Sequence, residues 1–504
     1  MAVEASLPPR HAADYLVDVY FQYQTPHLPI VGRSDAEEAI ESAYEAMDGR
    51  EVPGRAVERD ILVSFMILAI ALCDVSNPSG GRPSQSEGCF RSAIGWYEKA
   101  ITSSKSDIET LRTILLLAQF IALCPSRGSL WHLTGIALRL CIDMGLHWET
   151  DDRAVNMSSA TLYDRRRLWY STYQFDRMLC ITLGRPFGII DESIRVPLPN
   201  PWAIHRGTPS SEFDIHSQRA HNHLFLLSKL ASEIKHVQHS QVWALKIAYP
   251  RADYNLWVQD IQPRLEEWYA TIPPMNKAHQ ASIFASQAYW DYVYNNTLLL
   301  LYRPNISTTG SHMTSPDATV LAFAASCQLI ASIKTLQREG GVDILWQTAH
   351  HLFMAGLGVI YSLWQSKEVR DQNPRGSSVS TLQSCASTLS ALAESFPGVA
   401  GCRDAFDTLS SATVNWLVND NAGEPQHDGH HREFRKQAED LLQQLRPVRG
   451  VREEGGMKMS DMMVADGFLF SEMLSSAAQW PDSQDSALGD MGFDTLGGGF
   501  SVVN

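Results

Sequence analysis

Arginine and acidic side chains are concentrated in one stretch of the chain, from Asp164 to Pro199. Its first part carries three consecutive arginines near the start of a predicted helix: Arg165, Arg166 and Arg167. Positive charge at that end opposes the helix macrodipole, so acidic partners must compensate it. The acids nearest in sequence are Asp164, Asp191 and Glu192. We predict a partly buried ion-pair network that braces the helix. Contact with an anion or effector is the alternative, and the acidic chain disfavours a phosphate-backbone contact.

The same stretch continues with further charged residues and a helix stop. Asp176 and Arg177 are adjacent in mid-helix, and adjacent helical residues point about 100° apart. We therefore predict that the two do not pair with each other, and that they brace neighbouring helices instead of performing acid–base work. Gly184, Arg185 and Pro186 are typical of a helix end. Arg185 suits the negative end of the dipole, and its guanidinium could also fork onto a carboxylate.

No group of residues has the spacing of a catalytic or metal site. None of the eight cysteines belongs to a CxxC pair, whereas a structural zinc site needs close ligand pairs. His427, His430 and His431 are close in sequence, but they lie in a polar loop without an orienting partner. GxSxG, HExxH and P-loop motifs are absent, as is GxGxxG after a strand. We predict no catalytic residue and no cofactor or metal site, and we expect reduced, buried cysteines.

The composition is that of a globular protein. Of 504 residues, 44% are hydrophobic and 19% are charged, and the formal net charge is -15. This balance argues against strong direct binding to nucleic acid, which needs a basic surface. The longest nearly apolar run, Ile61 to Cys73, has about 13 residues, whereas a membrane span needs roughly 20. No apolar signal segment opens the sequence. We therefore expect a soluble intracellular protein without a membrane helix.

Apolar residues recur at helical spacing along most of the chain, and no segment shows the alternation of a β-strand. The sequence therefore predicts an all-α fold. The helix that carries the arginine triplet is expected over about Ser159 to Leu183, with Trp169 in the core. Gly145 is placed where a helix end needs a left-handed residue, and the apolar Leu146 follows it. Gln372 to Ser378 is predicted as a disordered connection.

Three regions follow from this pattern. Residues 1–418 form a large multi-helix domain, residues 419–458 a polar linker with a charged helix, and residues 459–504 a disordered tail. The linker holds the most basic stretch, Arg432 to Arg452, in which acids are interleaved. We expect a solvated helix there, and a nuclear-import contact is the alternative.

The tail differs from the rest of the chain in composition. It has seven acidic residues and no lysine or arginine, and apolar clusters alternate with the acids. Such a segment cannot form its own core, while charge repulsion keeps its aromatic side chains exposed. We predict an activation segment that folds on a transcription coactivator through four apolar anchors. These anchors are Phe468, Leu469, Phe470 and Leu474.

Four stretches, in this order, resemble the regulatory middle homology domain of the fungal binuclear zinc-cluster transcription factors. They are Leu7 to Ile30, Gly128 to Trp148, Arg165 to Pro199 and Asn295 to Pro304. The third resembles the family signature, with Arg165, Arg166, Arg167, Trp169, Asp176, Arg177, Gly184, Arg185 and Pro186. The resemblance implies an all-helical regulatory domain of a nuclear transcription factor. Such domains restrain or transmit activation, and in some members they bind a small effector.

The six-cysteine zinc cluster of that family has no counterpart in this sequence, and neither has the coiled coil for dimerisation that usually lies beside it. The resemblance therefore implies no zinc in this chain, and DNA contact only through a missing N-terminal module or a partner. Lost exons, truncation and true absence of the cluster remain as explanations, and dimerisation stays open. The expected function is control of a metabolic or secondary-metabolite gene set. A small-molecule sensor or cofactor-like regulator is the alternative, and a recruited biosynthetic enzyme is the third hypothesis.

Overall fold

The computed structural model describes residues 5–24, 28–50, 56–73, 84–103, 106–203, 212–240, 254–303, 316–342, 344–419 and Lys436. These ranges consist of helices and their connections, and the β-type pairing among them is an isolated bridge between Trp148 and Arg195. The predicted all-α fold is confirmed. The predicted tail with its four anchors, the histidine cluster and nearly all of the basic stretch lie outside the described residues.

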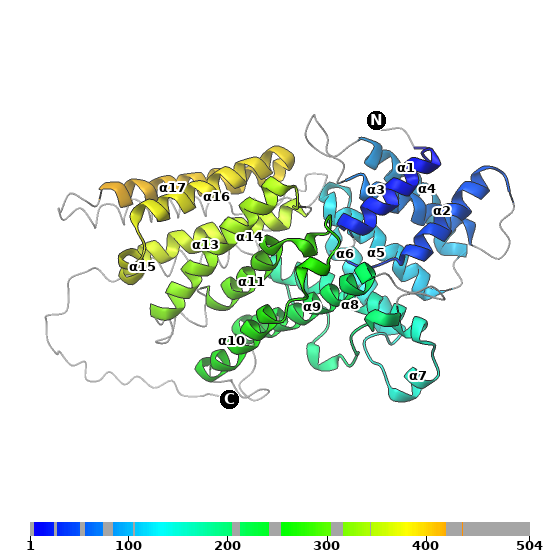
Figure 1. The fold of residues 1–504 in the computed structure, drawn as a ribbon, viewed down its shortest axis with the longest axis horizontal. Coiled ribbons are helices and arrows are strands. Elements are labelled where there is room, and N and C mark those ends of the chain that lie inside the picture. Colours follow the sequence, from blue (N-terminus) through cyan, green and yellow to red (C-terminus); the bar gives the residue numbers. More distant parts are fainter. Residues whose placement is uncertain are drawn as a thin grey trace, which may run out of the picture.

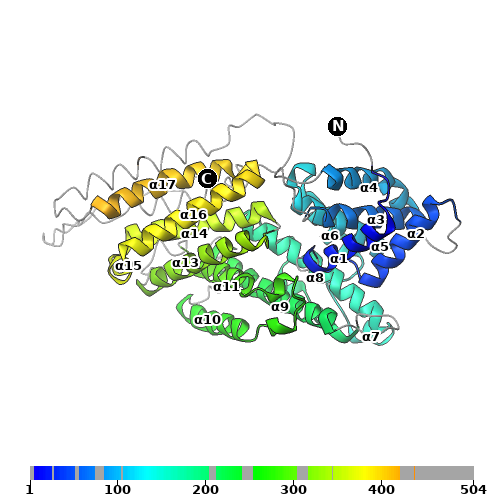
Figure 2. The same ribbon diagram turned by 45° about the horizontal axis from the view of Figure 1, so that its top comes forward.

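The first helices form one end of the molecule, and the last helices form the other end in both views (Figures 1 and 2). The first group is α1 Arg10–Val19, α2 Arg33–Met47, α3 Val57–Ala71, α4 Ser84–Ser103, α5 Asp107–Leu123 and α6 Leu130–Asp143. Within this group α3 packs against α1, α2, α4 and α5, and every residue from Asp60 to Ala71 is buried. A helix that is apolar on all sides has to be enclosed in this way. The expectation of a core helix in the run that starts at Ile61 is confirmed.

The helix α2 was not predicted from the sequence. Its buried face nevertheless follows helical spacing, through Ala36, Ala39, Ile40 and Ala43. Three of these four side chains are alanines, which contribute little hydrophobic signal. Acidic residues on the exposed positions hide that weak pattern further.

The middle of the chain forms α7 Asp151–Val155, α8 Ser159–Thr182, α9 Glu212–Lys235, α10 Tyr254–Ala270 and α11 Gln287–Tyr302. The helix α8 packs against α5 and α6 of the first group and against α9. Both α6 and α8 end as predicted, because Gly145 and Gly184 adopt positive φ angles of 63° and 61°. In each case the next residue donates its backbone N–H to a carbonyl five residues earlier, Leu146 to Cys141 and Arg185 to Cys180.

The last group is α13 Pro316–Glu339, α14 Leu345–Gln365, α15 Lys367–Gln372, α16 Arg375–Ser395 and α17 Ala400–Asn419. The predicted disordered connection from Gln372 to Ser378 is wrong. Only Asn373 and Pro374 separate α15 from α16. Proline favours the start of a helix, and Ser378 is buried against the core, so this polar segment is ordered by its packing.

One helix of the described residues, Ala318–Glu339 within α13, has the length and composition to span a membrane. Half of its apolar window is buried in the protein. It packs against α11, α14 and α16, as the core helix of a helical domain does.

The buried apolar side chains of the described residues form two clusters. The larger joins the first helices to α14, and the Trp346 Nε1–H of α14 donates to the carbonyl of Ala122 in α5 at 2.9 Å. The smaller lies among α9, α10 and α11, around Trp268 and Trp290. The helices α8, α9, α11 and α14 lie where the two clusters meet, and a cavity is located there.

Candidate regulatory site

Each arginine of the triplet in α8 has its own partner. The Nη2 of Arg165 donates to the carbonyl of Met144 at 3.2 Å, at the end of α6. Arg166 forms a bidentate pair with Glu149, with Nε–Oε2 and Nη2–Oε1 distances of 2.9 and 2.5 Å. Arg167 pairs with Asp164 at 2.8 Å. Of the acids expected from the sequence, Asp164 therefore lies with the triplet, whereas sequence reasoning missed Glu149.

The helix α5 joins this cluster through Arg112. Its Nη1 lies 2.9 Å from Glu109, and its Nη2 lies 3.6 Å from Asp164. The Arg112 and Arg167 side chains are 8% and 3% exposed, so both charges lie inside the protein. Together these contacts tie the start of α8 to α5 and to the end of α6.

Asp176 and Arg177 form a direct ion pair, with 2.5 Å between Oδ2 and Nη1. The prediction that they do not pair is wrong. The two Cα–Cβ bonds diverge, but the long arginine side chain folds back to the carboxylate of its neighbour. Burial raises the pKa of the Asp176 carboxyl, and the positive charge of Arg177 opposes that rise.

The pair holds the segment that follows α8, whereas the sequence predicted a contact with neighbouring helices. Asp176 accepts a hydrogen bond from the backbone N–H of Gly188 at 3.2 Å. Arg177 donates to the carbonyl of Ile189 at 2.8 Å, and its guanidinium lies between the rings of Tyr173 and Phe187, 4.3 and 4.2 Å from their centroids. This arrangement fixes the path of the chain after the helix stop.

The helix α9 reaches the same place through two residues. Asp191, after α8, accepts from Tyr173 at 2.6 Å, from Arg177 at 3.2 Å and from the hydroxyl of Ser232 in α9. The buried Lys235 of α9 donates to the carbonyls of Cys180 and Arg185, the latter at 2.6 Å. A cation at that position suits the negative end of α8. No local sequence signal pointed to Lys235, because about fifty residues separate it from its acceptors.

Two further signature residues, Arg185 and Trp169, make stacking or apolar contacts. The Arg185 guanidinium lies 4.7 Å from the ring centroid of Trp131 in α6, and it meets no carboxylate among the described residues. Trp169 is fully buried, and its Nε1–H has no hydrogen-bond partner within the part of the chain that the structure describes. The signature residues therefore form two groups, one near each end of α8.

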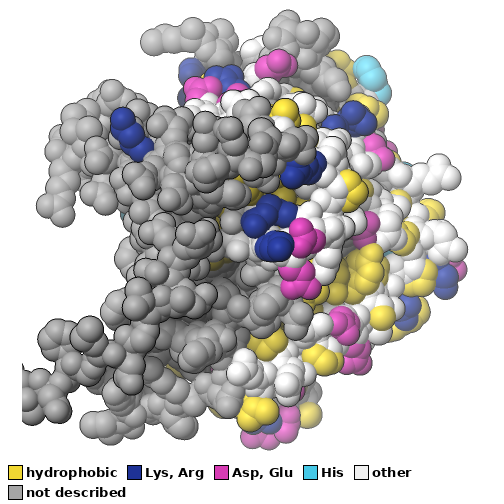
Figure 3. Space-filling view, turned by 90° about the vertical axis from the view of Figure 1, so that its left-hand side faces the viewer, with side chains coloured by type: hydrophobic (Ala, Val, Ile, Leu, Met, Phe, Trp, Pro, Cys, Tyr) yellow, Lys and Arg dark blue, Asp and Glu magenta, His cyan; other side chains and the backbone are white. Residues whose placement is uncertain are grey.

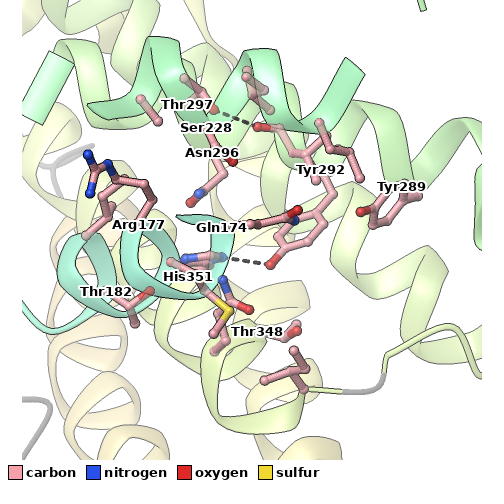
Figure 4. Close-up of a pocket in the computed structure, with 18 of the residues that line it drawn as sticks. Gln174, Arg177, Thr182, Ser228, Tyr289, Tyr292, Asn296, Thr297, Thr348 and His351 are labelled. Atoms are coloured by element: carbon pink, nitrogen blue, oxygen red, sulfur yellow. Dashed lines mark hydrogen bonds between the residues drawn. The ribbon is translucent and has the colours of Figure 1, made fainter. Parts of the chain in front are cut away.

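A cavity of about 180 Å³ lies beside the second half of α8 (Figure 4). Four helices supply its polar lining: Gln174 and Thr182 from α8, Ser228 from α9, Tyr292, Asn296 and Thr297 from α11, and Gln347, Thr348 and His351 from α14. Sequence reasoning named none of these residues, because no local pattern joins helices so far apart in the chain.

Tyr292 and His351 form a hydrogen-bonded pair in this cavity, with 2.7 Å between the hydroxyl oxygen and Nδ1. Burial lowers the pKa of His351, and the neighbouring His350 and Arg303 add to the effect. Burial also raises the pKa of the Tyr292 hydroxyl. The pair is therefore uncharged at neutral pH.

The surface in Figure 3 mixes charges of both signs. On that face, the coloured side chains of Lys and Arg lie beside those of Asp and Glu, with apolar side chains between them. Within the described ranges, no group of three or more His, Cys, Asp or Glu side chains is arranged to hold a metal ion.

Comparison with known proteins shows that part of the chain matches a protein family. Residues 17–270 match the family described as "Fungal specific transcription factor domain", a range that includes all of α8 and the signature residues. The chain is 26% identical over 84% of its length to the "Positive regulator of purine utilization" of Emericella nidulans. It is 26% identical over 54% of its length to the "Pyrimidine pathway regulatory protein 1" of Saccharomyces cerevisiae.

A third relative is the "Sorbicillinoid biosynthetic cluster transcription factor 2" of Penicillium rubens, with 21% identity over 74% of this chain. The three matches cover 48%, 30% and 57% of the relatives. The chain therefore spans less than two thirds of the length of each of these longer proteins.

Proposed function

This chain belongs to the family of fungal specific transcription factor domains, and on that premise we propose that it regulates transcription in the nucleus and is not an enzyme. The observation that carries the proposal is the match of residues 17–270 to that family. The similarity to the purine regulator extends over 84% of the chain, beyond the family match. Because the relatives are named for pathways and a biosynthetic gene cluster, a metabolic or secondary-metabolite gene set is the proposed target. DNA is reached through a further module or a partner.

The role proposed for α8 is to hold the regulatory domain together. Its first cluster of charges joins α5 and α6, and its second cluster joins α9 and the segment after the helix stop. A shift of α9 relative to α8 would have to break the hydrogen bonds that Ser232 makes with Asp191 and Lys235 makes with the carbonyls of Cys180 and Arg185. Leaving such buried polar groups unpaired is costly. The helix therefore transmits a change at one end of the molecule to the other end.

The proposed output is the acidic tail at residues 459–504. Four apolar side chains, Phe468, Leu469, Phe470 and Leu474, would enter a hydrophobic groove of a coactivator, and the seven acids would steer the encounter. The composition supports this role, because apolar clusters alternate with charges of one sign.

The tail should activate transcription when it is separated from the rest of the chain. Residues 459–504, fused to a foreign DNA-binding module, should activate a reporter gene in a fungal cell. Changing Phe468 and Phe470 together to Ala should reduce activation about tenfold or more, since losing two buried aromatic anchors removes several kcal/mol of binding. Reporter output, normalised to protein level, is the measurement.

Phe500→Ala in the same fusion is the matched control, because it removes a phenylalanine of the same tail outside the proposed anchors. It should leave activation nearly unchanged. A fusion that is inactive in its natural form, or a double variant as active as the control, would show that this segment is not the output.

A second function, sensing of a small molecule, is supported by the cavity between the two core clusters. Pockets between the helices of a bundle are common ligand sites. A ligand there would touch α8, α9, α11 and α14 at once. Its effect would then reach the tail through the helical domain.

A further inference from the structure

We propose that the cavity beside α8 binds a small uncharged ring compound with adjacent N–H and C=O groups, as in a cyclic amide. This inference rests on the proposed regulator function for its biological role, since the ligand would be the effector.

The size of the cavity suits a ligand of about one ring. An engineered apolar cavity of about 150 Å³ holds benzene. A volume of about 180 Å³ therefore accommodates a six-membered ring with one or two small substituents.

The walls of the cavity suit the faces of such a ring. Phe175 and Ile181 of α8, Leu224 and Leu227 of α9 and Leu300 of α11 supply apolar surface. These side chains come from both core clusters, so a ring between them would fill the gap where the clusters meet. Filling a void restores the dispersion contacts that the lining lacks.

The carboxamide of Gln174 is the polar feature that selects the ligand. Gln174 and His351 both point toward Tyr292 in the middle of the lining (Figure 4). The Oε1 atom of Gln174 is buried and has no hydrogen-bond partner among the described residues. A buried acceptor in that state costs folding free energy unless a donor is supplied. A cyclic amide supplies an N–H to Oε1 and a carbonyl to Nε2, which pairs the two amide groups.

The charges around the cavity favour an uncharged ligand. Apart from Arg177, the polar lining consists of amides, hydroxyls and the neutral Tyr292–His351 pair. Arg177 also lines the cavity, but its guanidinium already pairs with Asp176 and Asp191. An ionised ligand would lose its hydration without gaining a counter-ion, which is unfavourable.

The position of Gln174 connects the site to the proposed function. It lies in α8 one turn before Arg177, whose ion pairs hold the segment after the helix. A ligand on Gln174 that also contacts α11 and α14 would fix α8 relative to the last helices.

The test uses the purified full chain and 2-pyridone, an uncharged six-membered cyclic amide. Ligand-observed NMR and thermal unfolding should show saturable binding and a rise in Tm. Gln174→Leu should weaken binding at least tenfold without lowering the Tm of the free protein, because it removes an unsatisfied polar group at similar volume. Gln328→Leu, at an exposed position of α13, should bind as the natural chain does.

Toluene and benzoate, of similar size, are the matched ligands. Weaker binding of both than of 2-pyridone supports the inference. It is overturned by a flat 2-pyridone titration, by equal binding to the Gln174→Leu chain, or by tighter binding of benzoate. Each of these results would leave the proposed regulator function standing, because the reporter fusion of residues 459–504 does not contain the cavity.

Discussion

At the scale of single residues, His350 and His351 are buried side by side in α14. Burial lowers the pKa of His350 to about 3, and nearby Arg303 adds to that shift. The pKa of His351 is lowered for the same reasons, with His350 contributing. Both values lie below the usual 6.5 of the unfolded chain, so the unfolded chain binds more protons as the pH falls below that value. Their contribution to stability is present at neutral pH and is lost in acid.

We therefore expect these two histidines to reduce the free energy of unfolding by about 3 kcal/mol between about pH 7.5 and about pH 5.5. The double variant His350→Gln with His351→Gln should be less stable at neutral pH, because the hydrogen bond with Tyr292 is weakened. The free energy of unfolding of the double variant should fall less steeply as the pH is lowered. The variant lacks the two histidines, which together take up about two protons when the natural chain unfolds in acid. Denaturant unfolding across this pH range measures the slope.

His132→Gln is the control, since His132 is exposed on α6. Its pH slope should match that of the natural chain. Equal slopes for the natural chain and the double variant would show that the two histidines are not the source of the acid sensitivity.

Individual contacts at the site show which partners could be predicted from the sequence. Asp164 was predicted because it is adjacent to the triplet in sequence, and the structure pairs it with Arg167, three residues further along the same helix face. Glu149 and Lys235 were not found, because their contacts depend on how α6 and α9 pack against α8. The Asp176–Arg177 pair was predicted wrongly, since side-chain length outweighed the direction of the Cα–Cβ bonds.

At the scale of elements, glycine has opposite effects at two positions. Gly184 ends α8 with a φ of 61°, where a side chain is strained, whereas Gly95 lies inside α4 with nothing within 4 Å of an added Cβ. We expect Gly184→Ala to destabilise the protein by about 1–2 kcal/mol. Gly95→Ala should stabilise it by about 0.5–1 kcal/mol, because glycine is a poor helix former.

Chemical unfolding of the two variants beside the natural chain measures both effects. The two substitutions should change the free energy of unfolding in opposite directions. A Gly184→Ala chain as stable as the natural one would mean that the left-handed helix end is not formed in solution.

The helix ends could be predicted because they depend on a local residue, glycine, that adopts a positive φ angle. Some whole helices could not be predicted from the sequence. The run of leucine, isoleucine and alanine in α3 marked a core helix plainly. The alanine-based α2 and the polar start of α16 were missed or predicted wrongly. Both are helical because neighbouring helices bury their small side chains, and no short stretch of sequence contains that information.

At the scale of the whole molecule, the family match ends at residue 270, but the core continues beyond it. Trp346 of α14 reaches Ala122 of α5, and the rings of Trp364 and Trp416 stack with centroids 4.2 Å apart. The larger apolar cluster therefore needs α14 and α17.

We expect a chain of residues 1–419 to unfold cooperatively with the helical content of a folded domain. A chain of residues 1–399 lacks α17 and four large buried side chains, Phe406, Leu409, Trp416 and Leu417. Losing each of these side chains lowers the free energy of unfolding by about 2–5 kcal/mol. Together they account for as much as the whole free energy of unfolding of a domain, about 5–15 kcal/mol. A chain of residues 1–270 should fail to fold for the same reason.

Circular dichroism and thermal unfolding of the three truncated chains test this expectation. A cooperative transition in the shortest chain would show that the matched region is an independent domain.

The sequence by itself determined the all-α class, the core helix α3, the helix ends at Gly145 and Gly184 and the family signature. These features depend on residue periodicity and local backbone conformation, which neighbours along the chain specify. Only the tertiary structure decided which acids meet the arginine triplet, that Lys235 caps α8, and that a neutral cavity lies where two cores meet. Those contacts join residues that are far apart in sequence, and packing alone brings them together.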